Sequence, residues 1–169
     1  MKNIYLDNAA TTQVRQEVIA KMQVALANSY GNPSSTHSYG RTSKTAIESA
    51  RKTIAKRLNA QPSEIIFTSG GTEADNMILR CAVRDLKVKT IITTKIEHHA
   101  VLHIAEELHE KEGIDLWFVR LDTYGNPDIN HLEELLQKDD SKKLVSLMHV
   151  NNEIGNKIDI YFLFVLWCL

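Results

Sequence analysis

A pair of glycines, Gly70 and Gly71, is followed by Thr72 at the point where a short apolar run gives way to helical spacing of apolar residues. The first N–H groups of a helix lack partners within the helix, and its dipole is positive at that end, so this turn suits a phosphate. Glycine lets an anion approach the backbone closely, and the Thr72 hydroxyl adds a donor. The alternative is a capped helix start, in which Thr72 and Asp75 form a pattern like a capping box. The residues match neither a Walker loop nor Gly-x-Gly-x-x-Gly.

Two further polar clusters follow apolar runs that favour strands. Residues 97–99 come after the run at 90–94, and residues 151–153 come after the run at 144–148. Ligands of parallel sheets bind beyond the carboxyl ends of the strands, so we expect these clusters and residues 70–72 to lie at one edge. Taken without other evidence, His98 is interpreted as an ordinary histidine on the surface or at a helix start, and Asn152 can be simply a turn-forming asparagine.

The spacing of His99 and His103, four residues apart on an expected helix, can bind a metal ion. The sequence positions no third ligand, and the residues do not form a His-Glu-x-x-His motif. We therefore predict no metal site.

The elements that must position these residues alternate along the chain. We expect strands at residues 65–68, 90–94, 116–119 and 144–148. Helices are expected from Val14 to about Asn28, at 38–58, 72–85 and 98–111, and around Leu132, Leu135 and Leu136. In the helix after the glycines the apolar face is formed by Ala74, Met77, Ile78, Cys81 and Ala82. Strand–helix alternation predicts an α/β fold with a mostly parallel sheet covered by helices.

Size and composition are those of one soluble globular domain or a large part of one. The chain has 169 residues, 43% of them hydrophobic, and a net charge of −1, so no basic face suggests nucleic acid or an anionic membrane. The basic side of the helix at 38–58 is interpreted as a solvated surface. The two cysteines, Cys81 and Cys168, form no disulfide framework, and no signal peptide is evident, so a cytoplasmic location is expected.

Five stretches together resemble the cysteine desulfurase family, pyridoxal-phosphate enzymes of the class V aminotransferase group. In order they are Tyr5-Leu6-Asp7-Asn8-Ala9-Ala10-Thr11-Thr12, Gly31-Asn32-Pro33-Ser34-Ser35 with His37, Phe67-Thr68-Ser69-Gly70-Gly71-Thr72-Glu73 with Asn76, Glu97-His98 followed by Ala100-Val101-Leu102, and His149-Val150-Asn151-Asn152-Glu153-Ile154-Gly155. The resemblance covers residues 1–155. It implies a three-layer fold with helices on both faces of the sheet, similar to the N-terminal half of the large domain of a fold type I pyridoxal-phosphate transferase.

The resemblance also implies roles for individual residues. Gly71 and Thr72 match the loop that holds the phosphate of pyridoxal 5'-phosphate. His98 matches the histidine that stacks on the cofactor ring and helps to move protons on the substrate. Asn152 matches the asparagine at the ring oxygen, near the substrate carboxylate, and Asn8 and Ala9 resemble the loop that lines the substrate entrance.

Other family residues have no match in this sequence. The lysine that forms the Schiff base, the aspartate at the pyridine nitrogen and the cysteine that accepts sulfur belong after residue 155, and neither Lys95 nor Lys157 stands in the lysine's context. Cys81 is expected to be a small core residue. Residues 156–169 end in an apolar run unlike the family, so we expect a frameshift, a rearranged gene end or an incomplete gene. Because strands and much of the dimer interface of the family would then be missing, apolar faces would be exposed and we expect poor solubility.

The resemblance implies transfer of sulfur from L-cysteine, giving alanine and an enzyme persulfide, with this chain inactive alone. It further implies a homodimer in the intact family and delivery of sulfur to acceptor or iron–sulfur scaffold proteins. Three alternatives remain: half of a split desulfurase, a non-catalytic partner of a full-length one, or another class V activity such as an aminotransferase or selenocysteine lyase.

Overall fold

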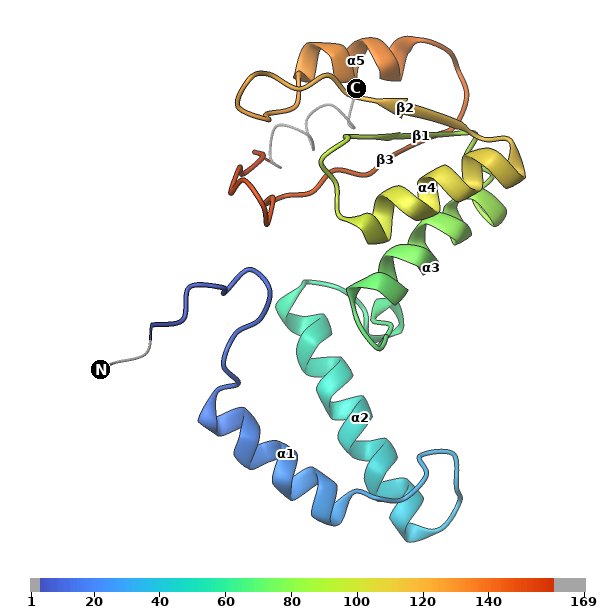
Figure 1. Cartoon of the computed structure of the whole chain (residues 1–169). Helices are drawn as coiled ribbons and strands as arrows, with labels where there is room; N and C mark the ends of the chain where they lie inside the picture. The colour runs from blue at the N-terminus through green and yellow to red at the C-terminus, as the bar shows by residue number, and fades with distance from the viewer. Residues whose placement is uncertain (1–3, 160–169) are drawn as a thin grey trace. The chain divides into compact units, whose positions relative to one another are not determined.

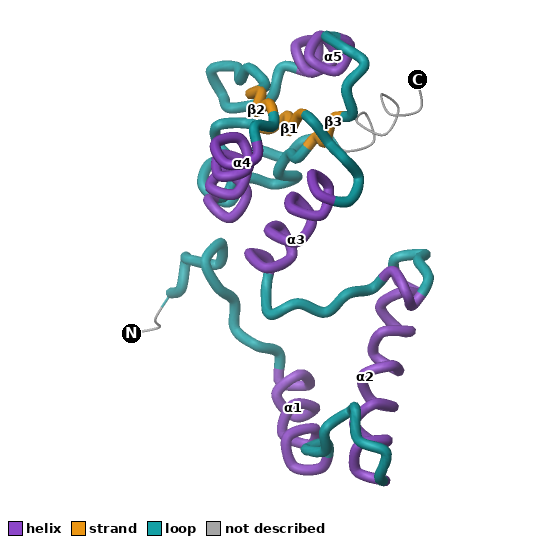
Figure 2. The backbone as a smooth tube through the Cα atoms, turned by 90° about the vertical axis from the view of Figure 1, so that its right-hand side faces the viewer, coloured by secondary structure: helices purple, strands orange, loops and turns teal. Residues whose placement is uncertain are grey.

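The computed structural model describes residues 4–159 and divides the chain into two compact units, residues 1–67 and 68–169. Figures 1 and 2 show the elements of each unit. Among the residues described, no helix is both long and apolar enough to cross a membrane. The expected apolar tail beyond residue 159 lies outside them.

The second unit contains a three-stranded parallel sheet in the order β2-β1-β3, which the sequence alternation predicted. Its strands are β1 at Thr90–Thr93, β2 at Asp115–Phe118 and β3 at Lys143–Val145. The central strand pairs Thr90 with Asp115 on one side and with Lys143 on the other. All four residues of β1 are buried, as expected of a strand covered on both faces.

Helices cover both faces of this sheet, so the three-layer architecture is confirmed (Figure 1). The helices are α3 at Gly71–Arg84, α4 at His99–Glu112 and α5 at Ile129–Gln137. Ile91 packs with α3 and α4, whereas the next residue, Ile92, packs with Leu132 of α5. Successive side chains of a strand point to opposite faces, so two adjacent isoleucines supply two cores.

Helix α4 buries Val101, Ala105 and Leu108, and Ile104 packs against them. The predicted face of α3 is wrong in part. Its buried residues are Leu79, Ala82 and Val83, and Ile78 is 57% exposed.

Cys81 is half-buried rather than a core residue, and its sulfur accepts a hydrogen bond of 3.6 Å from Arg84 Nη2. The two errors have one cause. The apolar side chains of α3 extend more than half-way round the helix, and only the tertiary contacts select which of them face α4 and β1.

The first unit consists of α1 at Gln16–Asn28, α2 at Ser38–Arg57 and a short 3-10 helix, η1, at Pro62–Glu64. The helices begin and end close to the predicted positions. Within the described chain α1 buries no residue, and its apolar residues Val18 and Met22 are 45% and 55% exposed.

The strand predicted at residues 65–68 is wrong. Residues 65–68 pair with no strand in the described chain; Ile66 is 65% exposed and Phe67 47% exposed. Arg51 instead donates to the Ile65 carbonyl and places its guanidinium 4.7 Å from the centre of the Phe67 ring. A strand requires the backbone of a neighbour, and β-branched and aromatic residues alone do not supply one.

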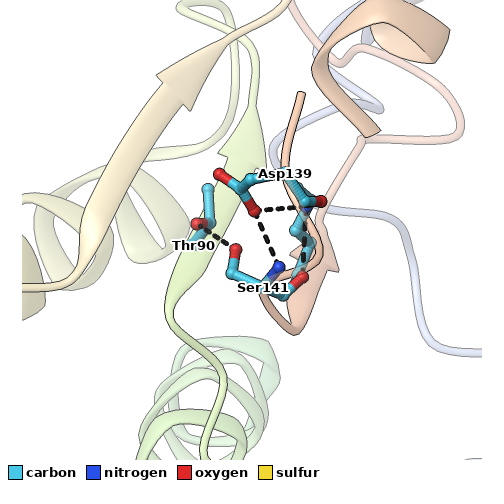
Figure 3. Close-up of polar contacts among 4 residues, drawn as sticks. Thr90, Asp139 and Ser141 are labelled. Carbon is cyan, nitrogen blue, oxygen red and sulfur yellow. Dashed lines mark hydrogen bonds and ion pairs between the residues drawn. The ribbon is translucent and has the colours of Figure 1, made fainter. Parts of the chain in front are cut away.

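The amino-terminal edge of the sheet is fixed by polar contacts around Lys143, whose side chain is 6% exposed. Its ammonium contacts Asp139 Oδ1 at 2.8 Å and the Ser141 carbonyl at 3.1 Å, and Ser141 Oγ lies 3.3 Å from Thr90 Oγ1 (Figure 3). The bonds from Lys143 and Ser141 hold the pKa of Asp139 well below its usual range. The Lys143 ammonium therefore makes its contacts at the amino-terminal edge of the sheet. The candidate site residues lie at the opposite edge, after the carboxyl ends of β1 and β3.

Candidate functional site

The glycine turn opens α3 with free backbone donors. The first bond of the helix runs from Ala74 N–H to the Gly70 carbonyl at 3.2 Å, so the N–H groups of Gly71, Thr72 and Glu73 precede it. A Cβ built on Gly70 or Gly71 meets nothing within 4 Å, and neither glycine has a φ in the left-handed region; the φ of Gly70, 172°, is that of extended backbone. Neither backbone conformation nor crowding among the described residues therefore requires glycine here, and a side chain at either position would extend into open space.

The helix is not capped as the alternative interpretation predicts. Gly70 is the N-cap residue and has no side-chain bond, and Thr72 is the second residue of α3. No hydrogen bond to the Thr72 hydroxyl is found among residues 4–159. The capping contact instead joins Ser69, through both its N–H and its hydroxyl, to Glu73 Oε2 at 2.6 Å, and these bonds lower the pKa of Glu73.

His98 is the N-cap of α4, and its ring is oriented by the helix that it caps. Ala100 N–H donates to His98 Nδ1 at 3.0 Å. Because Nδ1 is the acceptor, the neutral ring carries its proton on Nε2, which is the atom left to meet a ligand. The residue is exposed, and its ring lies edge-on to His99 with 6.4 Å between centroids.

Asn152 lies in the turn that follows β3 and is exposed. Its Nδ2 donates to Glu153 Oε1 at 2.9 Å, which leaves one amide hydrogen and the amide oxygen available. The turn itself is built by the preceding residue, Asn151, which is 5% exposed and accepts from Glu153 N–H at 2.8 Å and Ile154 N–H at 3.0 Å.

Contacts from a second loop support this turn. Asn156 Nδ2 donates to the Tyr124 carbonyl and to Asn126 Oδ1, the latter at 3.1 Å. Gly125 has a φ of +82°, and a Cβ there would stand 2.5 Å from Ile154 Cδ1. The loop after β2 therefore approaches the Asn152 turn at a distance that glycine permits.

Two buried polar residues join the His98 loop to the Asn152 turn, and sequence analysis assigned a role to neither. Glu97 Oε1 accepts from Met148 N–H at 2.7 Å, and Asn151 Nδ2 donates to the Ile96 carbonyl at 2.8 Å. Each lies directly before a predicted site residue. The sequence signal for these two residues was a polar residue next to a site residue after a buried strand. The sequence does not show, however, which polar residues are buried.

The structure thus brings His98 and Asn152 to one edge of the sheet, as predicted. The start of α3 lies on the same side. Arg80 of α3 and Glu107 of α4 form an ion pair of 2.7 Å and lie at similar positions along their helices. Asp75, near the start of α3, is close enough to Glu97 to contribute to the raised pKa of Glu97. Asn8 and Ala9 belong to the first unit, where Ala10 N–H and Thr11 N–H close a turn on the Asp7 carbonyl, and their role at the substrate entrance stays a prediction.

The rings of His99 and His103 lie 5.0 Å apart on α4. Over residues 4–159 no group of three or more His, Cys, Asp or Glu side chains is arranged to hold a metal ion.

Glu97 should make stability depend on pH in a specific direction. Burial raises its pKa above the ordinary 4.5, with a smaller contribution from Asp75, against the hydrogen bonds from Met148 and Thr94. A raised carboxyl pKa contributes stability that is present below the unfolded-state value and is lost as pH rises through the folded-state value.

We therefore expect wild type to gain stability relative to Glu97→Gln as pH falls from 7 towards 4.5, by about 1.4 kcal/mol for each unit by which the pKa is raised. Urea unfolding of both proteins across this range measures the difference. Parallel pH curves for the two proteins would contradict it.

The fold is a parallel sheet between helix layers, and the glycine turn, the capping histidine and the asparagine turn lie on one side of it. Residues 4–164 match the model of the aminotransferase class-V family, and the chain belongs to that family. The cysteine desulfurase IscS of Dictyoglomus turgidum is 48% identical over 156 residues, which are 91% of this chain and 39% of that protein. The resemblance read from the five motifs is therefore confirmed.

Solved structures agree with this assignment. A NifS-like protein superposes with a TM-score of 0.90 at 38% identity, covering 98% of this chain and 45% of the other. The structure of SspA in complex with cysteine superposes with a TM-score of 0.85 at 33% identity, covering 96% and 46%. The chain thus spans about two fifths of the length of the curated relatives that it matches.

Proposed function

We propose that this chain forms the part of a cysteine desulfurase that binds the phosphate and one face of pyridoxal 5'-phosphate, for a reaction on L-cysteine. The observation that carries the proposal is the start of α3. Three N–H groups and the Thr72 hydroxyl have no acceptor within the described chain, and a Cβ on the neighbouring Gly70 or on Gly71 would meet open space. A phosphate provides the acceptors that these donors lack.

The other candidate residues fit the same group. The flat ring of His98, held at Nδ1, can lie against a pyridine ring, and the free amide atoms of Asn152 can contact a ring oxygen or a carboxylate. When bound, the cofactor supplies an electron sink for cleavage at the substrate's β-carbon. His98 contributes a proton site at Nε2, the ring atom that faces away from the helix it caps.

Two roles are not filled by any motif of this chain, those of the Schiff-base lysine and of the thiol that accepts sulfur. We propose that residues beyond those matched here supply them, either on a longer form of the chain or on a second chain. The 169-residue chain alone is then expected to release no sulfide from L-cysteine. We further propose a homodimer and a sulfur-accepting or iron–sulfur scaffold protein as partner, which the family resemblance implies, and a cytoplasmic location, which fits a chain with only two cysteines.

Binding of the cofactor to the purified chain tests the proposal. We expect pyridoxal 5'-phosphate to bind at least about tenfold more tightly than pyridoxal, because only the former brings charge-assisted acceptors to the α3 turn. Gly71→Ala should remove most of that difference while leaving the free energy of unfolding unchanged or raised by up to about 1 kcal/mol.

Thr72→Val serves as a second variant and should weaken the phosphorylated ligand alone. Absorbance or fluorescence titration gives the affinities, and thermal unfolding provides the stability control. Equal affinities for the two ligands in wild type would refute the phosphate cradle.

A further inference from the structure

The loops that carry His98 and Asn152 are joined by a reciprocal pair of hydrogen bonds. Glu97, directly before His98, reaches the backbone of the β3 segment at Met148, and Asn151, directly before Asn152, reaches the backbone of the β1 loop at Ile96. The partners are separated in sequence by 51 and 55 residues, so these are bonds between loops rather than within one.

Both connecting side chains are buried although they are polar, with exposed fractions of 9% for Glu97 and 5% for Asn151. Burial of a polar group is unfavourable unless its bonds are made, and here they are made across the edge of the sheet. Thr94 Oγ1 adds a donor to Glu97 at 3.3 Å, and Asn151 satisfies both ends of its amide. Within the described chain, neither side chain hydrogen-bonds to His98 Nε2 or to the amide of Asn152.

We propose that Glu97 and Asn151 are positioning residues, forming a two-way clamp that fixes His98 and Asn152 relative to each other before any ligand binds. With both bonds in place, neither loop can move without breaking a buried bond to the other. When the groups that act on one ligand are already held in place, less conformational entropy is lost when the ligand binds. This purpose rests on the proposed function, whereas the clamp itself is a property of the ligand-free chain.

Amide hydrogen exchange of the full 169-residue chain tests the clamp without cofactor. Glu97→Ala should speed exchange at Met148 and also at Asn151 and Gly155, whose N–H groups bond to the Asn156 and Asn151 carbonyls. Loss of a buried bond predicts a roughly tenfold or larger increase in rate. Exchange at Asp115, which donates to the Lys89 carbonyl at the opposite edge, should be unchanged.

Conservative variants separate positioning from general loss of structure. Glu97→Gln keeps an acceptor for Met148 N–H and should restore slow exchange in the Asn152 turn. Asn151→Asp keeps the acceptor for Glu153 and Ile154 but loses the donor to Ile96, so it should speed exchange in the other loop, at Ala100. All variants are compared below the onset of their thermal unfolding.

The clamp is overturned if each substitution affects only its own loop, or if Glu97→Gln behaves as Glu97→Ala. A second measurement is the affinity for pyridoxal 5'-phosphate, which should fall about tenfold in Glu97→Ala and Asn151→Asp and stay near wild type in Glu97→Gln. If wild type binds no cofactor, the proposed function fails and the exchange data alone decide the clamp. Cofactor affinities that are equal in all variants, with wild type binding, would overturn the positioning role.

Discussion

Replacing Leu79 with alanine is expected to lower the free energy of unfolding of the second unit by about 2–5 kcal/mol. Leu79 is 2% exposed and packs in the cluster that joins α3 and α4 to β1. Truncation removes buried methyl groups and leaves a cavity that Ile91 and Leu108, themselves almost fully buried, cannot fill without moving.

The adjacent residue provides a matched control. Ile78→Ala removes a side chain of the same size from the same helix, but Ile78 is 57% exposed, so we expect a change within about 0.5 kcal/mol. Chemical denaturation followed by circular dichroism measures both. Equal losses in the two variants would contradict the packing of α3 through Leu79, and a larger loss in Ile78→Ala would mean that α3 presents its other face.

Replacing Gly40 with alanine is the second large expected effect, in the first unit. A Cβ on Gly40 would stand 2.4 Å from the Ser35 carbonyl oxygen and 2.6 Å from that of Asn32. Both are backbone atoms, so the loop at 31–36 must leave the start of α2. We expect a loss of about 1–3 kcal/mol, at the upper end of this range because no side chain can rotate away.

Hydrogen exchange across residues 29–45 should report this loss as faster exchange in the loop and in the first turns of α2. Ser49→Ala places the same residue at an exposed position of α2 and should be neutral or slightly stabilising. Unchanged exchange in Gly40→Ala would show that the loop does not pack against α2 as closely as the structure has it.

Pattern in the sequence predicted most of the second unit because its signals are local. Apolar runs at β1, β2 and β3 and helical spacing at α4 gave the element types, and alternation gave a parallel sheet. The prediction failed at residues 65–68, where composition favoured a strand but no neighbouring backbone pairs with it. It also failed for the face of α3, where Ile78 and Leu79 are equally apolar and only packing separates them.

The candidate site divides in the same way. The sequence by itself determined which chemical groups the site contains. A glycine pair, an imidazole and an amide that follow strand ends depend only on residue type and order. The tertiary structure alone decided that Glu97 and Asn151 are buried and reach across to each other's loops, because their partners lie 51 and 55 residues away in sequence. Such bonds depend on which strand ends become neighbours, and in this sheet β1 and β3 become neighbours only through pairing that skips β2 in the chain.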